Sequence, residues 1–530
     1  MSARVVSEEI ASTFGRLPPA FLPFGSRRLF EAQVELGLGD PVAMTVPDDF
    51  EIPELDRDRL DELQVRLLPQ PQRLTLPEAM VDAIARLAPT AGLRILYGDT
   101  LVEMAAPDFA RPDIVAVKST PENFPWAYCA PGENGAPRFS DAPPERLTER
   151  RVVCGYFTFS DPKRFAQACL GGDLLSALNA YAADPGLTPV EPARWSDFGH
   201  LPLLFQSRRT ALVARSFNTV SVEADFFIKR SNDAAKLRAE RAWYEALPAQ
   251  LRLHTPRLGA PVDDGAGYAL EYLHQPLLAD LFALGALPLA SWLEIFRACK
   301  TLMNRMHALR PPAGTPEAAS SYPRRFFSSV FVHKSWSRLD TFLSVRGLDR
   351  RARFTINGRT AAPIGDLVER CVASITPSTA DHIRYWHGDL SFGNLFYDFN
   401  AQRALCIDPR GQLPDGARVT YGDYRYDLAK LAHSVLGKYD KINLGRVRLQ
   451  DEGPQRFSYA VEQGLQEEAV EAAFIALAEN EYAVPCQELA AMTALLFLSM
   501  LPLHADDAAR QSALLCAGLE QARIVEEGWS

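Results

Sequence analysis

The spacing of apolar and polar positions divides the chain into two regions. In residues 1–205, short apolar runs typical of buried strands alternate with stretches in which apolar residues recur at the period of a helix. The strand candidates are residues 42–46, 93–99, 113–118 and 152–159, and the helix candidates are residues 76–88 and 162–182. Strands that alternate with helices predict an α/β domain with a largely parallel sheet.

Residues 206–530 predict a second domain with a different order of elements. Its first elements are expected strands at residues 210–215, 219–224 and 225–231, a charged helix at residues 232–247 and a strand at residues 267–273. Ser231 or Asn232 is the expected N-cap of that helix. From about residue 280 the pattern is mainly helical. The second domain is therefore expected to be α+β and bilobal, with a small strand-rich lobe before a larger helical lobe.

Composition narrows the partners that such a protein would have. The 530 residues carry a net charge of −10 with no basic stripe, which argues against nucleic acid as the main partner. The eight cysteines form no C-x-x-C pair, so no zinc site is expected. The longest apolar run, residues 490–503, is short for a bilayer span and predicts a buried helix, and the N-terminus shows no signal peptide. We therefore expect a cytoplasmic protein without membrane insertion, and the sequence indicates no protein partner.

The segment HGDLSFGN carries the first candidate chemistry. It places His387, Asp389, Leu390 and Asn394 in an H-x-D-L-x-x-x-N pattern. Phosphoryl transfer needs a carboxylate that orients the attacking hydroxyl and accepts its proton, and it needs a nearby oxygen ligand for Mg²⁺. A short loop would hold Asp389 and Asn394 on one side of such a site.

A second acid follows at a suitable place. Asp408 lies nineteen residues after Asp389, where the apolar run ALCI ends before the turn PRG. An acid at the end of a strand can present a second ligand to Mg²⁺. The competing interpretation is a surface turn with incidental acids, and the combination of four spaced residues with a strand that ends in an acid argues against it.

Together, HGDLSFGN and IDPRG resemble the catalytic and metal-binding segments of aminoglycoside phosphotransferases, choline kinases and related sugar kinases. The resemblance implies a protein-kinase-like fold, with ATP and Mg²⁺ as cofactors. It implies that Asp389 is the catalytic base and that Asn394 and Asp408 bind Mg²⁺. Gly388 stands where protein kinases have Arg, which favours a small-molecule acceptor over a protein acceptor.

Upstream residues extend the resemblance to the nucleotide. Lys229 ends the apolar run FFIK, where the family places its ATP-phosphate lysine, and Glu240 on the next helix is its expected partner, with Glu245 as the alternative. Lys229 is expected to be solvated in the absence of ATP, so its removal should cost little stability. The run LEYL resembles the hinge that recognises adenine through backbone groups, which assigns Glu271 and Leu273 to ATP binding.

Two further residues have structural interpretations. His307, in MNRMHAL, matches a helix position that is often His in the family, and we interpret it as structural. Asp427, in YRYDLAKLAH, matches an acid at the start of a helix, where capping and support of the catalytic loop are its expected roles.

The N-terminal region resembles sugar-nucleotide pyrophosphorylases, which are nucleotidyltransferases with a GT-A-like sheet. The segments that carry this resemblance are GRLPPAFLPFGSRRLFEAQ, LYGDTL and WSDFGH. The resemblance implies that Asp99 and Asp197 bind Mg²⁺ and thereby hold the phosphates of a nucleotide. We expect the two carboxylates to lie close together at the C-terminal edge of one sheet, facing a cleft.

The N-terminal region also departs from that family. The G-x-G-x-R loop that holds the triphosphate is missing, and Ala20 stands where the family has its catalytic Lys. Arg16, Arg27 and Arg28 are nearby cations that could substitute. An alternative interpretation is a domain that keeps the fold for substrate binding or scaffolding.

The whole chain is thus expected to phosphorylate a small hydroxyl compound, namely a sugar, a polyol or an amino alcohol, with ATP. Coupled nucleotidyl transfer would then make an NDP-activated precursor for surface polysaccharide. Its partners would be the acceptor and a nucleoside triphosphate. Two alternatives stay open: a nucleotidyltransferase whose kinase-like half mainly binds product, and a non-catalytic regulatory or assembly protein. Antibiotic resistance is a third use of the fold, which the additional domain argues against.

Overall fold

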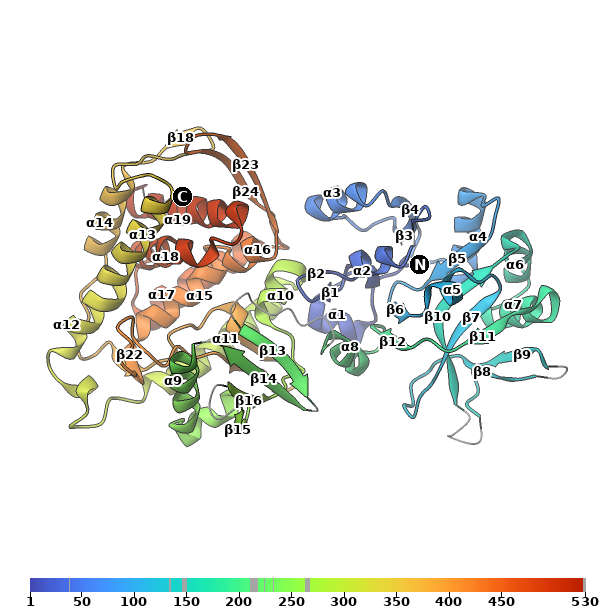
Figure 1. Ribbon diagram of the computed structural model, residues 1–530, viewed down its shortest axis with the longest axis horizontal. Helices are drawn as coiled ribbons and strands as arrows, with labels where there is room; N and C mark the ends of the chain where they lie inside the picture. The colour runs from blue at the N-terminus through green and yellow to red at the C-terminus, as the bar shows by residue number, and fades with distance from the viewer. Residues whose placement is uncertain are drawn as a thin grey trace. The chain divides into compact units, whose positions relative to one another are not determined.

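The chain forms two compact units, Met1–Ala211 and Leu212–Ser530 (Figure 1). This computed structural model describes residues 1–37, 39–132, 135–144, 150–209, 218–223, 225–231, 233–262 and 267–527. The strand expected at residues 210–215 lies outside the described residues.

In its described residues, the first unit combines helices with four groups of paired strands. Its helices are α1 (Glu8–Phe14), α2 (Leu29–Glu35), α3 (Glu54–Glu62), α4 (Leu76–Leu87), α5 (Ala106–Ala110), α6 (Pro162–Cys169), α7 (Leu174–Tyr181) and α8 (Leu201–Arg208). Its strands are β1 (Pro23–Phe24), β2 (Arg27–Arg28), β3 (Ala43–Pro47), β4 (Arg66–Gln70), β5 (Leu93–Leu96), β6 (Thr100–Glu103), β7 (Ile114–Ser119), β8 (Tyr128–Pro131), β9 (Pro137–Ser140), β10 (Arg151–Phe159), β11 (Thr188–Val190) and β12 (Arg194–Asp197).

The main sheet of the first unit is mixed, so the expectation of a largely parallel sheet was wrong. The long strand β10 pairs antiparallel with β5, β7 and β8, and within this sheet only β11 and β7 form a parallel pair in the described residues. Between β7 and β10 the chain makes the antiparallel pair β8–β9 rather than a crossover helix. Parallel neighbours need a long crossover connection, so β10 enters the sheet in the opposite direction.

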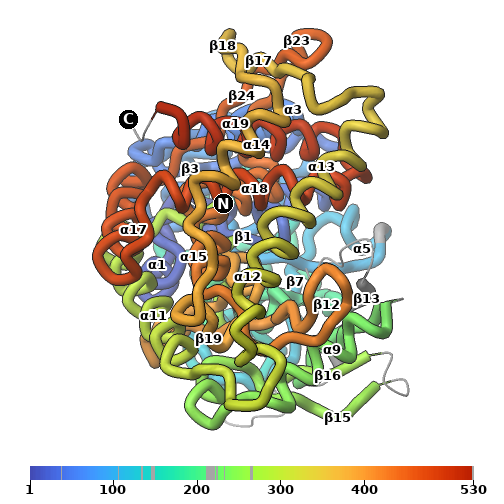
Figure 2. The backbone as a smooth tube through the Cα atoms, turned by 90° about the vertical axis from the view of Figure 1, so that its left-hand side faces the viewer, coloured from blue at the N-terminus to red at the C-terminus, as the bar shows by residue number. Residues whose placement is uncertain are grey.

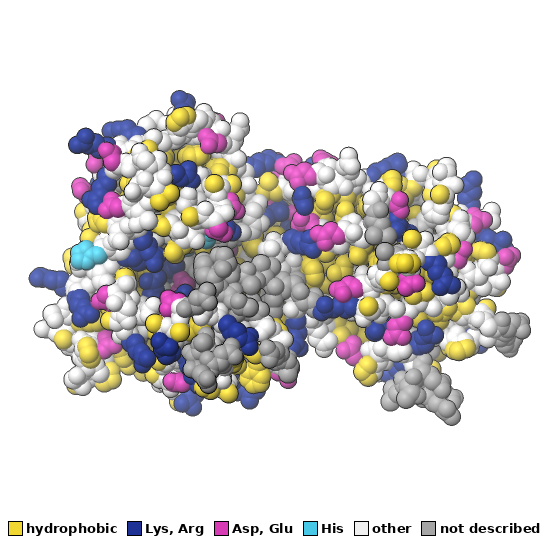
Figure 3. Space-filling view, in the orientation of Figure 1, with side chains coloured by type: hydrophobic (Ala, Val, Ile, Leu, Met, Phe, Trp, Pro, Cys, Tyr) yellow, Lys and Arg dark blue, Asp and Glu magenta, His cyan; other side chains and the backbone are white. Residues whose placement is uncertain are grey.

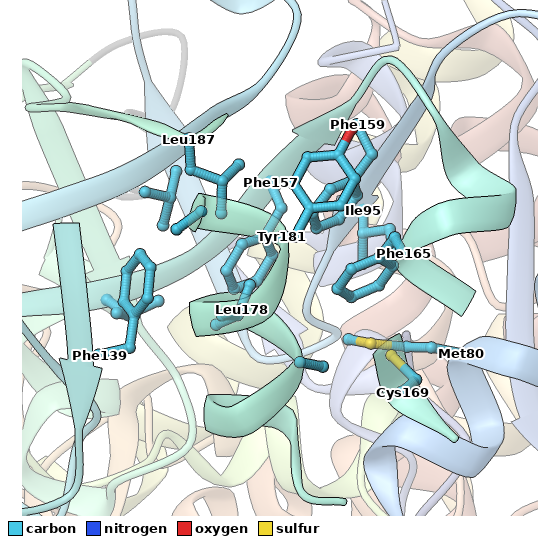
Figure 4. Packing of buried hydrophobic residues seen from close by; sticks show 14 of the residues in the cluster. Met80, Ile95, Phe139, Phe157, Phe159, Phe165, Cys169, Leu178, Tyr181 and Leu187 are labelled. Atoms are coloured by element: carbon cyan, nitrogen blue, oxygen red, sulfur yellow. The ribbon is translucent and has the colours of Figure 1, made fainter. Parts of the chain in front are cut away.

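The core of the first unit lies between this sheet and helices α4, α6 and α7 (Figure 4). Phe159 stacks on Phe165 of α6, with ring centroids 3.8 Å apart, and meets the edge of Tyr181 of α7 at 5.0 Å. The single helix expected at residues 162–182 is two helices, because Gly171 and Gly172 interrupt it and the Asp173 side chain caps α7 by accepting the Ser176 N–H.

The second unit begins with strands and continues mainly with helices. Its helices are α9 (Ala234–Glu245), α10 (Leu278–Leu284), α11 (Leu289–His307), α12 (Tyr322–Phe327), α13 (Lys334–Val345), α14 (Ile364–Ala373), α15 (Tyr424–Val435), α16 (Tyr439–Asn443), α17 (Glu467–Tyr482), α18 (Cys486–Met500) and α19 (Ala508–Glu527). Its strands are β13 (Asn218–Glu223), β14 (Phe226–Ser231), β15 (Leu258–Val262), β16 (Gly267–Glu271), β17 (Thr355–Ile356), β18 (Arg359–Thr360), β19 (Ile383–Tyr385), β20 (Leu395–Asp398), β21 (Arg403–Cys406), β22 (Tyr421–Asp423), β23 (Val447–Gly453) and β24 (Arg456–Val461).

The strands at the start of the second unit form a small lobe. They make an antiparallel sheet in the order β13–β14–β16–β15, and α9 packs against β14 and β16. Asp233 is the N-cap of α9, because its carboxylate accepts the Lys236 N–H at 3.0 Å. The expected caps, Ser231 and Asn232, were therefore wrong: Ser231 ends β14, and Asn232 lies outside the described residues.

Helix α18 is the centre of the helical lobe. It packs against α13, α14, α15 and α19, which lie together in Figure 2. With the turn that follows it, Cys486–His504 is long and apolar enough to cross a membrane by length and composition, yet 78% of its apolar window is buried inside the protein. Its apolar run is therefore explained by packing on all sides within the lobe.

Candidate active site

Lys229 lies at the centre of a buried ion-pair cluster in the second unit. Its Nζ donates to Glu240 Oε2 of α9 at 2.8 Å and lies 3.0 Å from Asp408 Oδ1, in the segment after β21. Tyr268 of β16 also donates its hydroxyl to Glu240, at 2.8 Å. Glu245 pairs with Arg241 instead, so Glu240 is the partner of Lys229. The cluster joins the small lobe to the segment that carries Asp408.

The environment of Lys229 differs from the solvated strand end that the sequence suggested. The side chain lies within β14 and is only 3% exposed. Burial opposes its charge, but the carboxylates of Asp408 and Glu240 outweigh burial and raise the pKa of Lys229. The expected solvation of Lys229 was therefore wrong, and its burial between two carboxylates predicts that its removal costs stability.

Helix α15 supports the loop that contains Asp389 through hydrogen bonds to its backbone. Asp427, in the first turn of α15, accepts the N–H groups of His387 at 2.9 Å and Gly388 at 2.7 Å. The expected capping role of Asp427 was wrong, since Asp423 is the N-cap and accepts the Arg425 N–H at 3.0 Å. Asp427 thus supports the loop through two backbone hydrogen bonds.

Gly388 is required by its surroundings as well as by its backbone. Its φ of +79° is in the region that favours glycine, and a Cβ atom there would lie 2.7 Å from the Cβ of Arg410. A side chain at this position would push apart the two segments that carry Asp389 and Asp408, because the Arg410 N–H donates to His387 O at 2.8 Å.

Asn394 and Asp408 are brought together by strand pairing. β20 and β21 are antiparallel, and the Ile407 N–H extends the pair by donating to Asn394 O at 3.0 Å. Asn394 is buried and donates its Nδ2 to Asp389 O at 2.8 Å. A carboxylate and an amide oxygen on adjacent segments are hard oxygen ligands of the kind that Mg²⁺ uses together with substrate phosphates, so the residues fit this ion. The described residues contain no cluster of three or more His, Cys, Asp or Glu side chains suited to a metal.

Two cations beside Asp389 were missed by the sequence reasoning. Lys430 of α15 places its Nζ 2.7 Å from Asp389 Oδ1, and Arg410 lies close enough to act on the same carboxylate. Burial opposes ionisation of Asp389, but Lys430 and Arg410 hold its pKa below the usual value. Arg410 follows Asp408 in the motif IDPRG and Lys430 follows Asp427 by three residues, which was the only available signal.

The other expected ATP-binding residues lie at the end of β16. Glu271 ends the strand, and its carboxylate accepts the N–H and Nε–H of Arg257, both at 3.2 Å. Leu273 follows in the connection to α10. The Glu271 side chain is thus directed to Arg257.

In the first unit, the side chains of Asp99 and Asp197 lie close together. Asp99 precedes β6 and Asp197 ends β12, and these strands pair antiparallel with Asp197 opposite Thr100. A Cβ atom at Gly199 would lie 2.7 Å from Asp99 Oδ2 and 3.5 Å from Asp197 Oδ1, so both carboxylates border the same backbone position. The two acids are close, as expected, but not at the edge of one sheet, because Asp99 follows β5 of the main sheet and β12 pairs with β6 in a separate sheet.

The carboxylate of Asp197 is already engaged by protein donors. It accepts the Trp126 Nε1–H at 2.8 Å and the Gly199 N–H at 2.8 Å, and His200 Nδ1 lies 3.0 Å away. Burial and the charge of Asp197 raise the pKa of Asp99 to about 6. The pair is a donor set that suits Mg²⁺, but the ion would have to displace the imidazole of His200.

The cations that were expected to substitute in the first unit are paired elsewhere. Arg28 is buried and binds Asp56 at 2.8 Å, Arg16 binds Glu8 at 2.9 Å, and Arg27 binds Glu35. Ala20, in the position of the expected catalytic Lys, is 1% exposed. The structure therefore shows no group in these four positions that is directed to a triphosphate.

Comparison with known proteins finds a family match over part of the chain. Residues 211–465 match the sequence model of a family described as the phosphotransferase enzyme family. The matched range contains the candidate site residues of the second unit, and α17–α19 follow it. No curated protein matches the chain in sequence.

Several solved structures are similar over parts of the chain. One is a provisionally assigned aminoglycoside phosphotransferase of Ralstonia eutropha, with 16% identity, a TM-score of 0.36, and coverage of 62% of this chain and 96% of the other. A choline/ethanolamine kinase family protein of Mesorhizobium loti has 13% identity, a TM-score of 0.27, and coverage of 59% and 87%. The inositol-1-phosphate CTP transferase of T. maritima has 12% identity, a TM-score of 0.32, and coverage of 40% and 96%.

Proposed function

We propose that the second unit is a kinase that transfers a phosphoryl group from ATP to a hydroxyl group of a small molecule. The premise is the match of residues 211–465 to the phosphotransferase enzyme family. The acceptor class expected from the sequence is a sugar, a polyol or an amino alcohol. ATP as the donor is consistent with a reaction in the cytoplasm.

The observation that carries the proposal is the ion-pair cluster of Lys229, Glu240 and Asp408. A Lys–Glu pair that positions the lysine for nucleotide phosphates is a recurring part of phosphoryl-transfer sites, and here Lys229 also contacts an acid that could hold the metal. The cation of the small lobe thus lies beside the acid that we propose as a Mg²⁺ ligand.

Asp389 would orient the acceptor hydroxyl and accept its proton. Because Lys430 holds its pKa low, Asp389 is ionised at neutral pH and is a weak base. A weak base suffices for phosphoryl transfer through a loose transition state, because the bond to the attacking oxygen is little formed and the hydroxyl proton need not be removed early. Lys430 would keep the carboxylate in place while the hydroxyl approaches.

Asn394 and Asp408 would hold Mg²⁺, and Lys229 would contact the phosphates of ATP. The bound metal would offset the negative charge of the phosphates during transfer. The protein supplies the pre-arranged oxygens: the Asn394 side chain is fixed by its hydrogen bond to Asp389 O, and Asp408 is fixed by Lys229.

An acceptor screen with ATP and Mg²⁺, read by mass spectrometry of the products, tests the proposal. We expect Asp389→Asn to lower the rate of phosphomonoester formation by about 10²–10⁴-fold, the usual contribution of a positioned base. Asp381→Asn is the matched control, because it removes the same charge from an exposed position in the same region. Undiminished turnover in Asp389→Asn would exclude the proposed site.

The proximity of Asp99 and Asp197 favours a second function in the first unit, nucleotidyl transfer to the phosphomonoester that the kinase makes. The two activities in sequence would yield an NDP-activated compound of the kind used for surface polysaccharide. In the same mass analysis with each nucleoside triphosphate added, Asp99→Asn should abolish the nucleotidyl product and leave the phosphomonoester. If no nucleotidyl product forms with the wild-type chain, a binding or assembly role remains for this unit.

A further inference from the structure

A pocket of about 580 Å³ lies beside the proposed kinase site in the second unit. One wall is the run of helix from α12 into α13, and the other is the loop at Pro414 and Asp415. Between α12 and α13, residues Ser328–His333 are π-helical, a local widening that is frequent at functional sites. We call this the basic pocket, after the lining side chains Arg325, His333, Lys334 and Arg338.

Positive charge dominates the surroundings of the basic pocket. In the described part of the chain, no carboxylate forms an ion pair with Lys334, Arg338 or Arg410, and the one acid of the lining, Asp415, is exposed and lies 3.4 Å from Arg325. Lys334 is only 5% exposed. Figure 3 shows Lys and Arg side chains bordering a hollow on the face of the second unit that carries α12 and α13. Buried cations are normally paired, so this arrangement calls for an anion.

Tyr426 connects the basic pocket to Asp389. Its hydroxyl accepts from Lys334 Nζ at 2.7 Å and from Arg410 Nη2 at 3.2 Å. Tyr426 and Lys430 are one turn apart on α15, on the same face of the helix, and Lys430 binds Asp389. The basic pocket is therefore linked to the proposed catalytic carboxylate through Tyr426 and Lys430.

The titration behaviour of the pocket wall agrees with this excess of positive charge. Burial lowers the pKa of Lys334 to about 7, with Arg410 and Arg338 acting in the same direction. Burial opposes ionisation of Tyr426, yet Arg410, Lys334 and Lys430 lower its pKa to about 7. The phenol of Tyr426 thus accepts hydrogen bonds from two cations, Lys334 and Arg410.

We infer that the acceptor is a small hydroxyl compound that carries an anionic group, a phosphate ester or a carboxylate, and that the basic pocket holds this group. The inference rests on the proposed kinase function and names its substrate class. Arg325 and Arg338 would bind the anion from the pocket wall, and Lys334 would bind it from the floor. The reacting hydroxyl would then extend towards Asp389.

The same arrangement disfavours an acceptor that carries ammonium groups. Such a group would meet like charge at Arg325, Lys334 and Arg338, and within the pocket lining only the exposed Asp415 would attract it. The amino alcohols expected from the sequence are therefore the least suitable of the three acceptor classes, whereas sugar phosphates, polyol phosphates and sugar acids suit the pocket.

Calorimetric titration of the full chain tests the inference. The protein is first saturated with Mg²⁺ and a non-hydrolysable ATP analogue, so that phosphate probes cannot occupy the nucleotide site. The probes are inorganic phosphate and two sets with a common frame: glycerol 3-phosphate, glycerate, glycerol and serinol, and glucose 6-phosphate, glucuronate, glucose and glucosamine. We expect the anionic members to bind at least about 10-fold more tightly than the neutral and amine members. The phosphate and carboxylate arms show which anion is preferred.

Variants then locate the binding. Arg325→Gln and Lys334→Met should each weaken binding of the anionic probe by about 10-fold. Arg324→Gln is the matched control, since it removes the same charge from the neighbouring exposed position outside the pocket lining, and it should leave affinity unchanged. Arg325 is exposed, so its variant keeps the test valid if Lys334→Met does not fold.

Two results would overturn the inference while the kinase proposal stands. One is binding of the ATP analogue with no preference for anionic probes, or with preference for the amines. The other is equal weakening by Arg324→Gln and Arg325→Gln. By contrast, if the wild-type chain fails to bind the ATP analogue at all, the kinase proposal itself is wrong.

Discussion

At the scale of single residues, the second unit depends on charges that are buried in contact with one another. Lys229 lies between two carboxylates, Asp389 lies against Lys430, and Arg425 is buried against Asp423 and Glu488 at 2.5 Å and 2.6 Å. Each pair costs desolvation, and each is kept by contact between its members. Removal of one member therefore leaves the other as a buried charge without a partner, which destabilises the fold.

Lys229→Met tests this at the proposed nucleotide site. We expect a loss of about 3 kcal/mol in the free energy of unfolding of the second unit, because Glu240 and Asp408 would remain without their cation, together with weaker ATP binding. Lys236→Met is the control, because Lys236 lies on α9 with Glu240, its Nζ is 3.8 Å from that carboxylate and its side chain is 43% exposed. Denaturant unfolding and nucleotide titration of both variants give the answer, and an unchanged midpoint in Lys229→Met would contradict the role of the cluster.

At the scale of elements, helices pack against the short loops of the candidate site and hold them in place. α15 holds the loop of His387 and Gly388 through Asp427 and binds Asp389 through Lys430. α11 contributes His307, whose ring packs on Tyr424 of α15 at 4.4 Å and on Tyr482 of α17 at 5.3 Å. The structural interpretation of His307 agrees with these contacts, which join three helices.

Acid should weaken this packing. Burial, aided by Arg384, lowers the pKa of His307 from 6.5 to about 4, so the folded unit holds the ring neutral. The stability that depends on the neutral ring is present above pH 6.5 and is lost as the pH falls towards about 4. We expect His307→Gln to flatten the decline in unfolding free energy between pH 7 and pH 4 by about 2 kcal/mol.

Urea unfolding of wild type and variant across this pH range measures the effect. Part of the decline should persist in His307→Gln, since burial also lowers the pKa of His387 to about 4 and that of His433 well below its usual value. Parallel curves for the two proteins would show that His307 does not titrate in this range.

At the scale of the whole molecule, each unit has its own core and its own candidate site. The first unit ends at Ala211 and the second begins at Leu212, and no residue of one candidate site comes from the other unit. Two cores of this size are expected to unfold as separate cooperative units.

Scanning calorimetry of the full chain should therefore show two transitions. A non-hydrolysable ATP analogue with Mg²⁺ should raise the midpoint temperature of only one transition. At a ligand concentration of 100 Kd it should add about 2.7 kcal/mol to the free energy of unfolding of the second unit, and Lys229→Met should lower the same midpoint. Asp99→Asn should alter only the other transition. A single transition that responds to all three changes would show that the units unfold as one.

Most features that could be predicted from the sequence depend on residues that lie close together along the chain. Strands such as β7 and helices such as α4 follow directly from the period of their apolar residues, and α4 begins and ends within one residue of the expected range. The candidate residues Asp389, Asn394 and Asp408 were recognisable because loop chemistry depends on short spacings that the sequence displays. Asp99 was predicted from an apolar run that ends in an acid, and Asp197 from the resemblance carried by the segment WSDFGH.

Contacts between distant segments required the folded chain. Lys430 and Asp389 are brought together only by the docking of α15 under the loop, and the basic pocket is assembled from α12, α13 and the segment after Arg410. The direction of β10 depends on how the chain returns after β9, which apolar periodicity does not encode. Periodicity and short motifs report which residues are buried or chemically paired along the chain, whereas the partners of a buried charge depend on the packing of whole elements, and in this protein those partners define the proposed acceptor.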